Sequence, residues 1–272
     1  MQKNFCVIGS DARQRAAAAA LRTEGFTILS AEEIGQADYI LLPMPMEAEQ
    51  ADLARLLRAA RPGTLALGGR VSAPVQAAAQ AAGVELLDYF LRPELACLNT
   101  VPTAEGCLCL LMQKMDRTLW ESAILVLGYG RVGHAVAQRL ALLGARVTVA
   151  ARSPAQRAAA RCVACHAEPL TTLPRLLPET DAVVNTIPAR VLDRDLLARV
   201  PTAAPVIDLA SRPGGVDFDA ARELGVRTEH ALSLPARCAP RTAGELVAQT
   251  VLTMLREREE GLHDAVEKGA MP

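Results

Sequence analysis

Short apolar runs alternate with alanine-rich, helix-like segments along the first hundred residues. Strand-like runs fall at Phe5–Gly9, Thr27–Leu29, Tyr39–Leu42, Thr64–Gly68 and Val84–Leu87. Helix-like segments fall between them, at Arg13–Thr23, Ala48–Ala60 and Pro74–Ala82. Strands that alternate with helices at such short intervals predict a parallel sheet covered on both faces.

A second series of the same kind starts at Ala123 and continues to about Leu234. Between the two series, the sequence from Pro102 opens an apolar helix that runs to about Lys114, which we expect to connect two domains. Near the C-terminus, the amphipathic segment Ala243–Arg258 predicts a helix that crosses back to the first domain.

The second series begins with an apolar strand, Ala123–Leu127, that leads directly into the sequence Gly-Tyr-Gly-Arg-Val-Gly. A G-x-G-x-x-G motif between a strand and a helix is typical of dinucleotide-binding domains. Gly128 allows the tight turn, Gly130 lets a diphosphate approach the backbone, and Gly133 permits close contact between helix and strand. The phosphates are then expected on the N–H groups at the start of the helix. The alternative is a glycine-rich turn in an α/β protein that binds no nucleotide.

These patterns predict an α/β protein with two Rossmann-like parallel-sheet domains and a cofactor cleft between them, similar in plan to the 2-hydroxyacid dehydrogenases. Residues 1–100 and the C-terminal helix 240–262 are expected to form a substrate domain of flavodoxin or Rossmann type. Residues 101–239 are expected to hold the connector helix and the NAD(P)-binding domain.

Arg152 and Ser153 follow the second strand of the nucleotide domain, where NAD enzymes place an acidic residue that binds the ribose 2′-hydroxyl. An arginine can instead bind a 2′-phosphate through two hydrogen bonds. We therefore expect NADP in preference to NAD, with NAD still possible; the alternative is that Arg152 is a solvated loop residue. The expected cofactor-binding residues are Gly128, Tyr129, Gly130, Arg131, Val132, Gly133, Arg152, Ser153, Thr186, Ile187, Pro188, Leu209, Ala210 and Ser211.

Two later strands are expected at Asp181–Asn185 and Pro205–Leu209. The last six of these residues end such a strand or follow it directly, and they are expected at the nicotinamide half of the cofactor because open α/β sheets bind ligands at their carboxyl edge. Asp208 can either anchor the loop backbone or contact the ligand.

Composition and local sequence patterns argue against several other kinds of function. The net charge is −1 and only 3% of the residues are aromatic, so a nucleic-acid groove is not expected. The run Cys162–His166 spells a c-type haem attachment signature, but its place between a Rossmann helix and strand favours ordinary packing, and no metal is expected. The first apolar run is too short for a signal peptide, and no apolar segment approaches the ~20 residues that span a bilayer. We therefore expect a cytoplasmic protein with no membrane partner.

The sequence Asp-Leu-Ala-Ser-Arg-Pro-Gly-Gly at 208–215, together with Asn-Thr-Ile-Pro at 185–188, resembles the A subunits of dipicolinate synthase. Further segments share the resemblance, namely 9–14, 99–106, 234–235 and 239–244. Ser10, Ala236 and Arg241 depart from the glycine, glycine and lysine that the family pattern leads us to expect.

The resemblance implies oxidation of a dihydrodipicolinate-type ring from the lysine pathway to pyridine-2,6-dicarboxylate, with NADP as hydride acceptor. It also implies that the partner is a flavodoxin-like B subunit and that the protein serves sporulation, and we expect a homo-oligomer. A dicarboxylate substrate requires cationic or N–H-rich anchors. The candidate catalytic residues are Glu105, Thr103 and Arg13, and the candidate substrate-binding residues are Asp11, Arg13, Asn99, Arg212, Arg241 and Thr242.

Each charged candidate has a structural alternative: Arg13 can begin a surface helix, Glu105 can favour a helix start, and Arg241 can cap the last helix. Two other functions also remain open. A D-2-hydroxyacid dehydrogenase has a similar arrangement of two domains. Its catalysis requires an Arg, a Glu and a His late in the cofactor domain, and His230 is the one histidine of this sequence in such a position. A non-catalytic protein that senses NADP and supports the chemistry of a partner is the second alternative.

Overall fold

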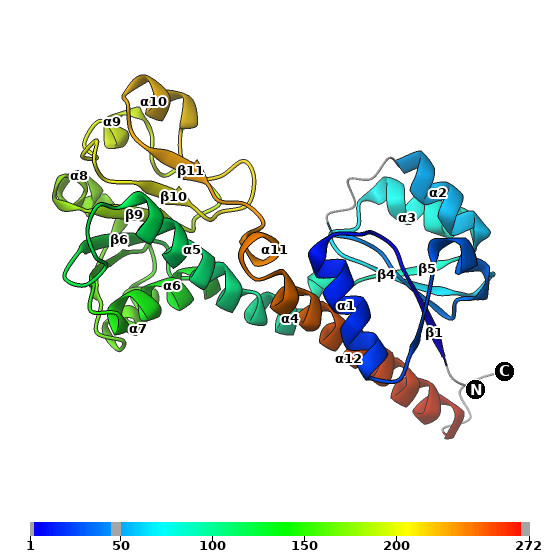
Figure 1. Cartoon of the computed structure of the whole chain (residues 1–272). Coiled ribbons are helices and arrows are strands. Elements are labelled where there is room, and N and C mark those ends of the chain that lie inside the picture. Colours follow the sequence, from blue (N-terminus) through cyan, green and yellow to red (C-terminus); the bar gives the residue numbers. More distant parts are fainter. Residues whose placement is uncertain (1–2, 45–49, 268–272) are drawn as a thin grey trace. The chain divides into compact units, whose positions relative to one another are not determined.

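The computed structural model describes residues 3–44 and 50–267, and the chain divides into two compact units. Unit 1 comprises the residues up to Asn99 together with those from Ala239 onward. Unit 2 comprises Thr100–Cys238. Each unit contains one parallel sheet with helices on both faces (Figure 1), so the predicted α/β class with two parallel-sheet domains is confirmed.

The sheet of unit 1 has five parallel strands in the order β2-β1-β3-β4-β5. The strands are β1 (Asn4–Val7), β2 (Thr27–Leu29), β3 (Tyr39–Leu41), β4 (Leu65–Gly68) and β5 (Glu85–Asp88). This is the strand order of flavodoxin-like folds, in which the chain reverses direction across the sheet beside the first strand. The helices are α1 (Ala12–Thr23), α2 (Gln50–Ala59), α3 (Ala73–Ala81), α4 (Pro93–Leu98) and α12 (Pro240–Glu267).

Successive residues of β1 face opposite sides of this sheet, as the alternation of side chains along a strand requires. Phe5 belongs to the core under α1 and α12, whereas Cys6 belongs to the core under α2 and α3. The C-terminal helix α12 lies along α1 (Figure 1), and the two approach so closely that a Cβ on Gly244 would be 2.3 Å from the Arg13 carbonyl oxygen. The described part of the predicted helix 48–60 begins at Gln50, and α12 continues past residue 262 to Glu267.

The sheet of unit 2 has six parallel strands in the order β11-β10-β9-β6-β7-β8. The strands are β6 (Ala123–Leu127), β7 (Arg146–Ala150), β8 (His166–Glu168), β9 (Ala182–Asn185), β10 (Val206–Asp208) and β11 (Thr228–His230). This is the Rossmann order, with the direction of winding reversed between β6 and β9. The helices are α5 (Thr100–Lys114), α6 (Arg131–Leu142), α7 (Pro154–Arg161), α8 (Leu173–Leu176), α9 (Arg194–Leu197), α10 (Phe218–Glu223) and α11 (Leu234–Cys238).

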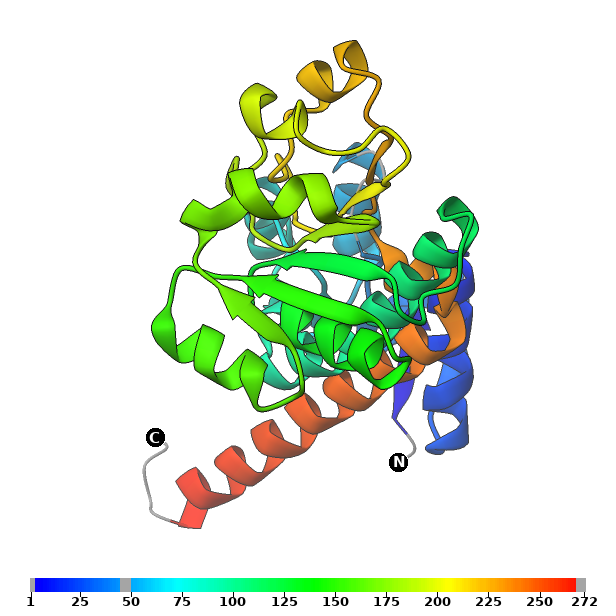
Figure 2. The same cartoon turned by 90° about the vertical axis from the view of Figure 1, so that its left-hand side faces the viewer.

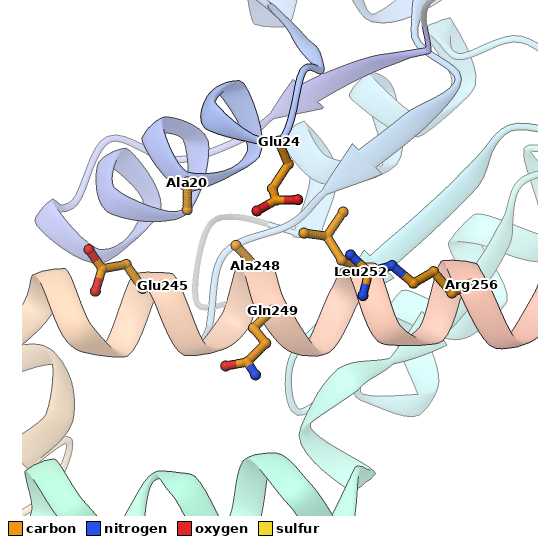
Figure 3. Close-up of a pocket in the computed structure, with 7 residues that line it drawn as sticks. All are labelled: Ala20, Glu24, Glu245, Ala248, Gln249, Leu252 and Arg256. Atoms are coloured by element: carbon orange, nitrogen blue, oxygen red, sulfur yellow. The ribbon is translucent and has the colours of Figure 1, made fainter.

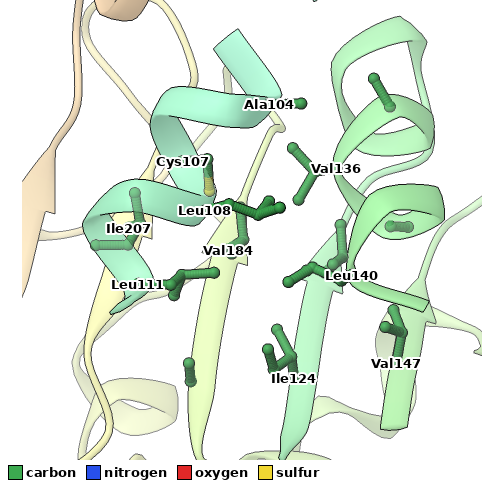
Figure 4. Packing of buried hydrophobic residues seen from close by; sticks show 14 of the residues in the cluster. Ala104, Cys107, Leu108, Leu111, Ile124, Val136, Leu140, Val147, Val184 and Ile207 are labelled. Atoms are coloured by element: carbon green, nitrogen blue, oxygen red, sulfur yellow. The ribbon is translucent and has the colours of Figure 1, made fainter. Parts of the chain in front are cut away.

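Helices lie on both faces of this sheet (Figure 2). An apolar core lies between the sheet and the helices on each face. Helices α5 and α6 cover one face, where Leu111 and Leu140 point toward Ile124 and Val184 of the strands (Figure 4). The shorter helices α8, α9 and α10 cover the other face. Both faces of the strands are therefore buried, which is why these strands are continuous apolar runs in the sequence.

One helical segment corrects a prediction. Pro93–Lys114 is long and apolar enough to cross a membrane, with a mean hydropathy of 1.4, so the expectation that no apolar segment approaches that length is wrong. The same composition is typical of a core helix. Cys107 and Leu111 of α5 are completely buried against α6 and the sheet, and this packing accounts for the apolar character of α5.

Candidate functional site

The glycine motif forms the turn that joins β6 to α6. Gly128 has a φ of +88°, and its N–H donates to the Ala150 carbonyl at the end of β7 (2.9 Å). A Cβ on Gly128 would lie 2.7 Å from Oγ1 of Thr186. Both the backbone conformation and the lack of space therefore require glycine here.

The other two glycines of the motif differ from each other in what surrounds them. A Cβ on Gly133 would lie 2.3 Å from the Gly128 carbonyl oxygen, so the helix can pack on the turn only without a side chain at this position. A Cβ on Gly130 would meet nothing within 4 Å. Folding therefore does not require glycine at position 130, and an approaching ligand remains as the reason for a bare backbone there.

The start of α6 is left without a side-chain cap. Gly130 occupies the N-cap position and, within the described part of the chain, no side chain accepts a hydrogen bond there. By contrast, α1 and α7 are capped by Asp11 and Ser153. The first N–H groups of α6 and the positive end of its dipole are thus available to an anion. The turn fits a nucleotide diphosphate.

Tyr129, Arg131 and Val132 lie within the same turn but face different surroundings. The Tyr129 ring is buried and packs against His134, with ring centroids 5.2 Å apart. Burial raises the pKa of its hydroxyl, which finds no hydrogen-bond partner among the described residues. Arg131 is exposed at the helix start and Val132 is half-buried. Tyr129 therefore supports the turn from the core side.

Two arginines lie where β7 ends and α7 begins. Arg152 is exposed, and Ser153 accepts the Gln156 N–H as the N-cap of α7. Arg157, which no motif in the sequence marks, donates to the carbonyls of Ala151 and Arg152 at 2.8 and 2.7 Å. The loop that would hold the adenosine ribose therefore carries two guanidinium groups and no carboxylate.

The loops after β9 and β10 are tied together by buried side chains. Nδ2 of Asn185 donates to Oδ1 of Asp208 (2.8 Å) and to the Ile187 carbonyl (3.1 Å). Asp208 also accepts the N–H groups of Ala210 (3.0 Å) and Gly215 (2.7 Å). Asp208 is completely buried, so of its two possible roles the structure supports anchoring the loop backbone.

His230 is engaged in the same region. Its Nε2 lies 2.8 Å from the Ala210 carbonyl oxygen, and its ring stacks on Phe218 with centroids 5.2 Å apart. A nitrogen that donates to a carbonyl is not available to accept a proton. This arrangement favours a structural role for His230.

The remaining candidates of unit 2 lie on α5 and in the turn after β10. Thr103 and Glu105 are inside α5, which starts at Thr100. None of the described residues in the first turn of α5 is acidic, so the alternative that Glu105 favours the helix start is wrong. Thr103 is half-buried, Glu105 is exposed, and Arg212 is exposed in the turn that precedes Gly214.

In unit 1, Arg13 is the candidate with the most unusual surroundings. Its residue exposure is 7%, so the alternative of a surface helix residue is wrong. Its Nε is buried and has no partner in the residues that the structure describes. Burial raises the pKa of the nearby Tyr89 hydroxyl, and the Arg13 guanidinium opposes that effect. Asp11 accepts the Gln14 N–H as the N-cap of α1 (2.9 Å).

The other candidates of unit 1 lie at the start of α12 and at the end of α4. Arg241 and Thr242 are exposed at the start of α12, just before the contact of Gly244 with Arg13. Arg241 forms an ion pair with Glu245 of its own helix (2.8 Å) and is 88% exposed. Asn99 is half-buried at the end of α4.

A shallow groove runs between α1 and α12, and it contains none of the predicted site residues. It is lined by Ala20, Glu24, Glu245, Ala248, Gln249, Leu252 and Arg256 (Figure 3). Among the described residues no group of three His, Cys, Asp or Glu side chains could hold a metal ion. The run Cys162–His166 has one exposed and one buried thiol, and Cys165 packs in the core of unit 2.

Comparisons with known proteins agree with this geometry. Residues 110–220 match the family described as D-isomer specific 2-hydroxyacid dehydrogenase, NAD binding domain. The chain is 38% identical over 181 residues to the A subunit of dipicolinate synthase from Bacillus subtilis (strain 168). That alignment covers 65% of this chain and 60% of the relative, which is less than two thirds of its length.

Solved structures extend the similarity along the chain. The crystal structure of the dipicolinate synthase A subunit from Bacillus halodurans has a TM-score of 0.84 at 29% identity and covers 93% of this chain and 97% of that one. This chain resembles the A subunits of dipicolinate synthase. The Bacillus subtilis structure has a TM-score of 0.81, also at 29% identity, and covers 96% and 98% of the two chains. The resemblance noted in the sequence is thereby confirmed, and the match to an NAD-binding domain supports a nicotinamide dinucleotide cofactor.

Proposed function

We propose that this chain acts as the A subunit of a dipicolinate synthase, which oxidises a dihydrodipicolinate-type ring to dipicolinate with hydride transfer to NADP. The observation that carries the proposal is the 38% identity over 181 residues to the Bacillus subtilis relative. The uncapped start of α6 beside Gly130 supports the cofactor part.

Aromatisation of the ring removes a hydride from one ring carbon and a proton from its neighbour. The nicotinamide would supply the hydride acceptor, so the chain's own residues must hold the dianion and take the proton. Arg13 is the first choice for a carboxylate, because a buried guanidinium nitrogen without a partner gains most from an anion. Arg212 and Arg241, with Asp11, Asn99 and Thr242, are the further binding candidates. Thr103 and Glu105 are proposed to position the ring or relay the proton.

The preference for NADP rests on charge at the end of β7. Arg152 directly precedes Ser153 and is exposed, and Arg157 donates to the Arg152 carbonyl, so two arginines belong to the turn where Ser153 caps α7. A 2′-phosphate would gain charge-assisted hydrogen bonds there, whereas an NAD ribose would miss the usual carboxylate.

The D-2-hydroxyacid dehydrogenase alternative is favoured by the family match of residues 110–220 but not by the site. That chemistry requires a histidine that exchanges a proton with the substrate. Nε2 of His230 is already within 2.8 Å of the Ala210 carbonyl.

The resemblance extends the proposal to the chain's context. We propose that its partner is a flavodoxin-like B subunit, that the chain itself forms a homo-oligomer, and that it is cytoplasmic and serves sporulation. Gel filtration of the purified chain measures whether it forms a homo-oligomer. Gel filtration together with the B subunit measures whether the two subunits form a complex.

The activity is tested with purified chain, dihydrodipicolinate and NADP⁺ or NAD⁺, with and without the B subunit. The reduced nucleotide is followed by its absorbance, and dipicolinate is identified by mass. Dipicolinate formed with NADP⁺, in an amount equal to the NADPH formed, is the expected result. Reduction of 2-oxoacids in place of this reaction would favour a hydroxyacid dehydrogenase. Binding of NADPH without turnover, even with the B subunit, would favour a sensing role.

A further inference from the structure

Two completely buried polar side chains lie directly beneath the loops that follow β9 and β10. Asn185 ends β9 and Asp208 ends β10, and the two are register partners in neighbouring parallel strands. Both have an exposure of 0%. Neither can contact a ligand directly, yet both occupy the carboxyl edge of the sheet, where open α/β proteins bind ligands.

Their hydrogen bonds hold the two loops to each other. Asn185 uses both atoms of its amide group on the first loop, because Nδ2 donates to the Ile187 carbonyl (3.1 Å) and Oδ1 accepts the Ile187 N–H (3.1 Å). Asp208 uses both oxygens on the second loop, one for the Ala210 N–H and one for the Gly215 N–H. The bond between the two side chains, 2.8 Å long, joins the pairs.

The turn at Gly214 and Gly215 fits between these anchors without room for a side chain. A Cβ on Gly214 would lie 2.7 Å from Oδ2 of Asp208, and one on Gly215 would lie 2.3 Å from Nδ2 of Asn185. The Gly215 carbonyl in turn accepts the N–H groups of Val191 and Leu192 (2.9 and 3.0 Å). The loop after β10 is thus attached to the loop after β9 at several points.

We infer that Asn185 and Asp208 are positioning residues for the nicotinamide half of the dinucleotide. This inference rests on the proposed function. The loops they hold, Thr186–Pro188 and Leu209–Ser211, would face the nicotinamide, whereas the glycine turn and Arg152 would hold the diphosphate and the adenosine half. A fixed pair of loops loses little conformational freedom when the ring binds, so the ring gains affinity and a defined orientation.

The test separates the two halves of the cofactor. Titration calorimetry measures the Kd of NADPH and of 2′-phospho-ADP-ribose, which lacks the nicotinamide ring. Three N–H donors point at the two carboxylate oxygens of Asp208. In Asp208→Asn only the side-chain oxygen can accept, so the new NH2 group must face at least one of these donors. We expect the Kd of NADPH to rise about tenfold and that of the fragment to stay within about twofold.

A matched control lies at the opposite end of the same sheet. Asp181 accepts the Ala123 N–H (2.7 Å) and an Arg117 guanidinium (2.9 Å) just before β9 begins. Asp181→Asn removes a comparable anchor far from the carboxyl edge, and both Kd values should be unchanged. A parallel rise of both Kd values in Asp208→Asn, or no rise of either, overturns the inference.

A second measurement needs no variant. In the wild-type chain, NADPH should slow hydrogen exchange of the amides in Leu209–Gly215, and 2′-phospho-ADP-ribose should not. Equal Kd values for NADPH and the fragment in the wild-type chain also overturn the inference, because the ring then gains nothing from these loops. If the wild-type chain binds neither compound, the proposed function itself fails, which is a separate result.

Discussion

Gly133 and Gly128 are packed so closely that a Cβ on Gly133 would stand 2.3 Å from the Gly128 carbonyl oxygen. The contact joins the first turn of α6 to the turn after β6. Since backbone meets backbone, neither side can yield without moving the helix. Gly133→Ala should therefore lower the free energy of unfolding by about 1–3 kcal/mol. Urea unfolding measures the change, and an unaltered midpoint would contradict it.

Gly130→Ala should leave the stability unchanged and weaken nucleotide binding. Its Cβ meets nothing within 4 Å, so the variant should unfold at the same urea concentration as the wild type. The new methyl group would stand where the diphosphate approaches the backbone, and NADPH affinity should fall by about tenfold or more. Calorimetry checks this. Unchanged affinity would mean that the diphosphate binds elsewhere.

Arg152→Ala should change the choice between the two nucleotides. Losing one charge-assisted hydrogen bond to a 2′-phosphate should raise the Kd of NADPH about tenfold and leave the Kd of NADH nearly unchanged. Arg161→Ala, on the exposed end of α7, is the matched control and should affect neither. Equal effects on both nucleotides in Arg152→Ala would remove the basis for the NADP preference.

Arg13→Met should separate substrate binding from stability. The variant removes a buried donor that has no partner in the described structure, so the free energy of unfolding should not fall. Activity with dihydrodipicolinate should fall about tenfold or more in kcat/KM if the guanidinium binds a carboxylate. Arg22→Ala, exposed in the last turn of α1, serves as the control. Full activity of Arg13→Met would exclude Arg13 from the substrate site.

Cys6 should make unit 1 sensitive to alkaline pH. Burial raises the pKa of its thiol from 9.0 to about 11, with a smaller contribution from the Glu33 carboxylate. Because the thiolate is less favourable in the folded state, the stabilisation is complete below pH 9.0 and is lost as the pH rises through about 11. Urea midpoints of wild type and Cys6→Ala should therefore converge between these pH values. A constant difference would show that the thiol does not ionise on unfolding there.

The nucleotide half of the site could be predicted from the sequence because its signals are local. The strand, the three glycines and the apolar helix from residue 123 to 143 are contiguous, and steric rules assign each glycine its place. The structure confirms the resulting fold class. The sequence also showed Arg152 at the end of β7, but not Arg157, whose contact with the Ala151 and Arg152 carbonyls depends on how α7 begins.

Other features depend on contacts between residues distant in the sequence. Arg13 had the same pattern as a surface helix residue, yet it is buried, in a helix whose backbone packs closely on Gly244 of α12. Asn185 and Asp208 are 23 positions apart and meet only because β9 and β10 pair in register.

The sequence by itself determined the two βα series, the glycine turn and the absence of an acidic residue after β7, because each depends on neighbouring residues. The tertiary structure alone decided the strand orders, the burial of Arg13 and the bond between Asn185 and Asp208. The physical reason is that strand pairing and helix packing select among partners by burial and hydrogen bonding across the whole fold, which local periodicity does not encode.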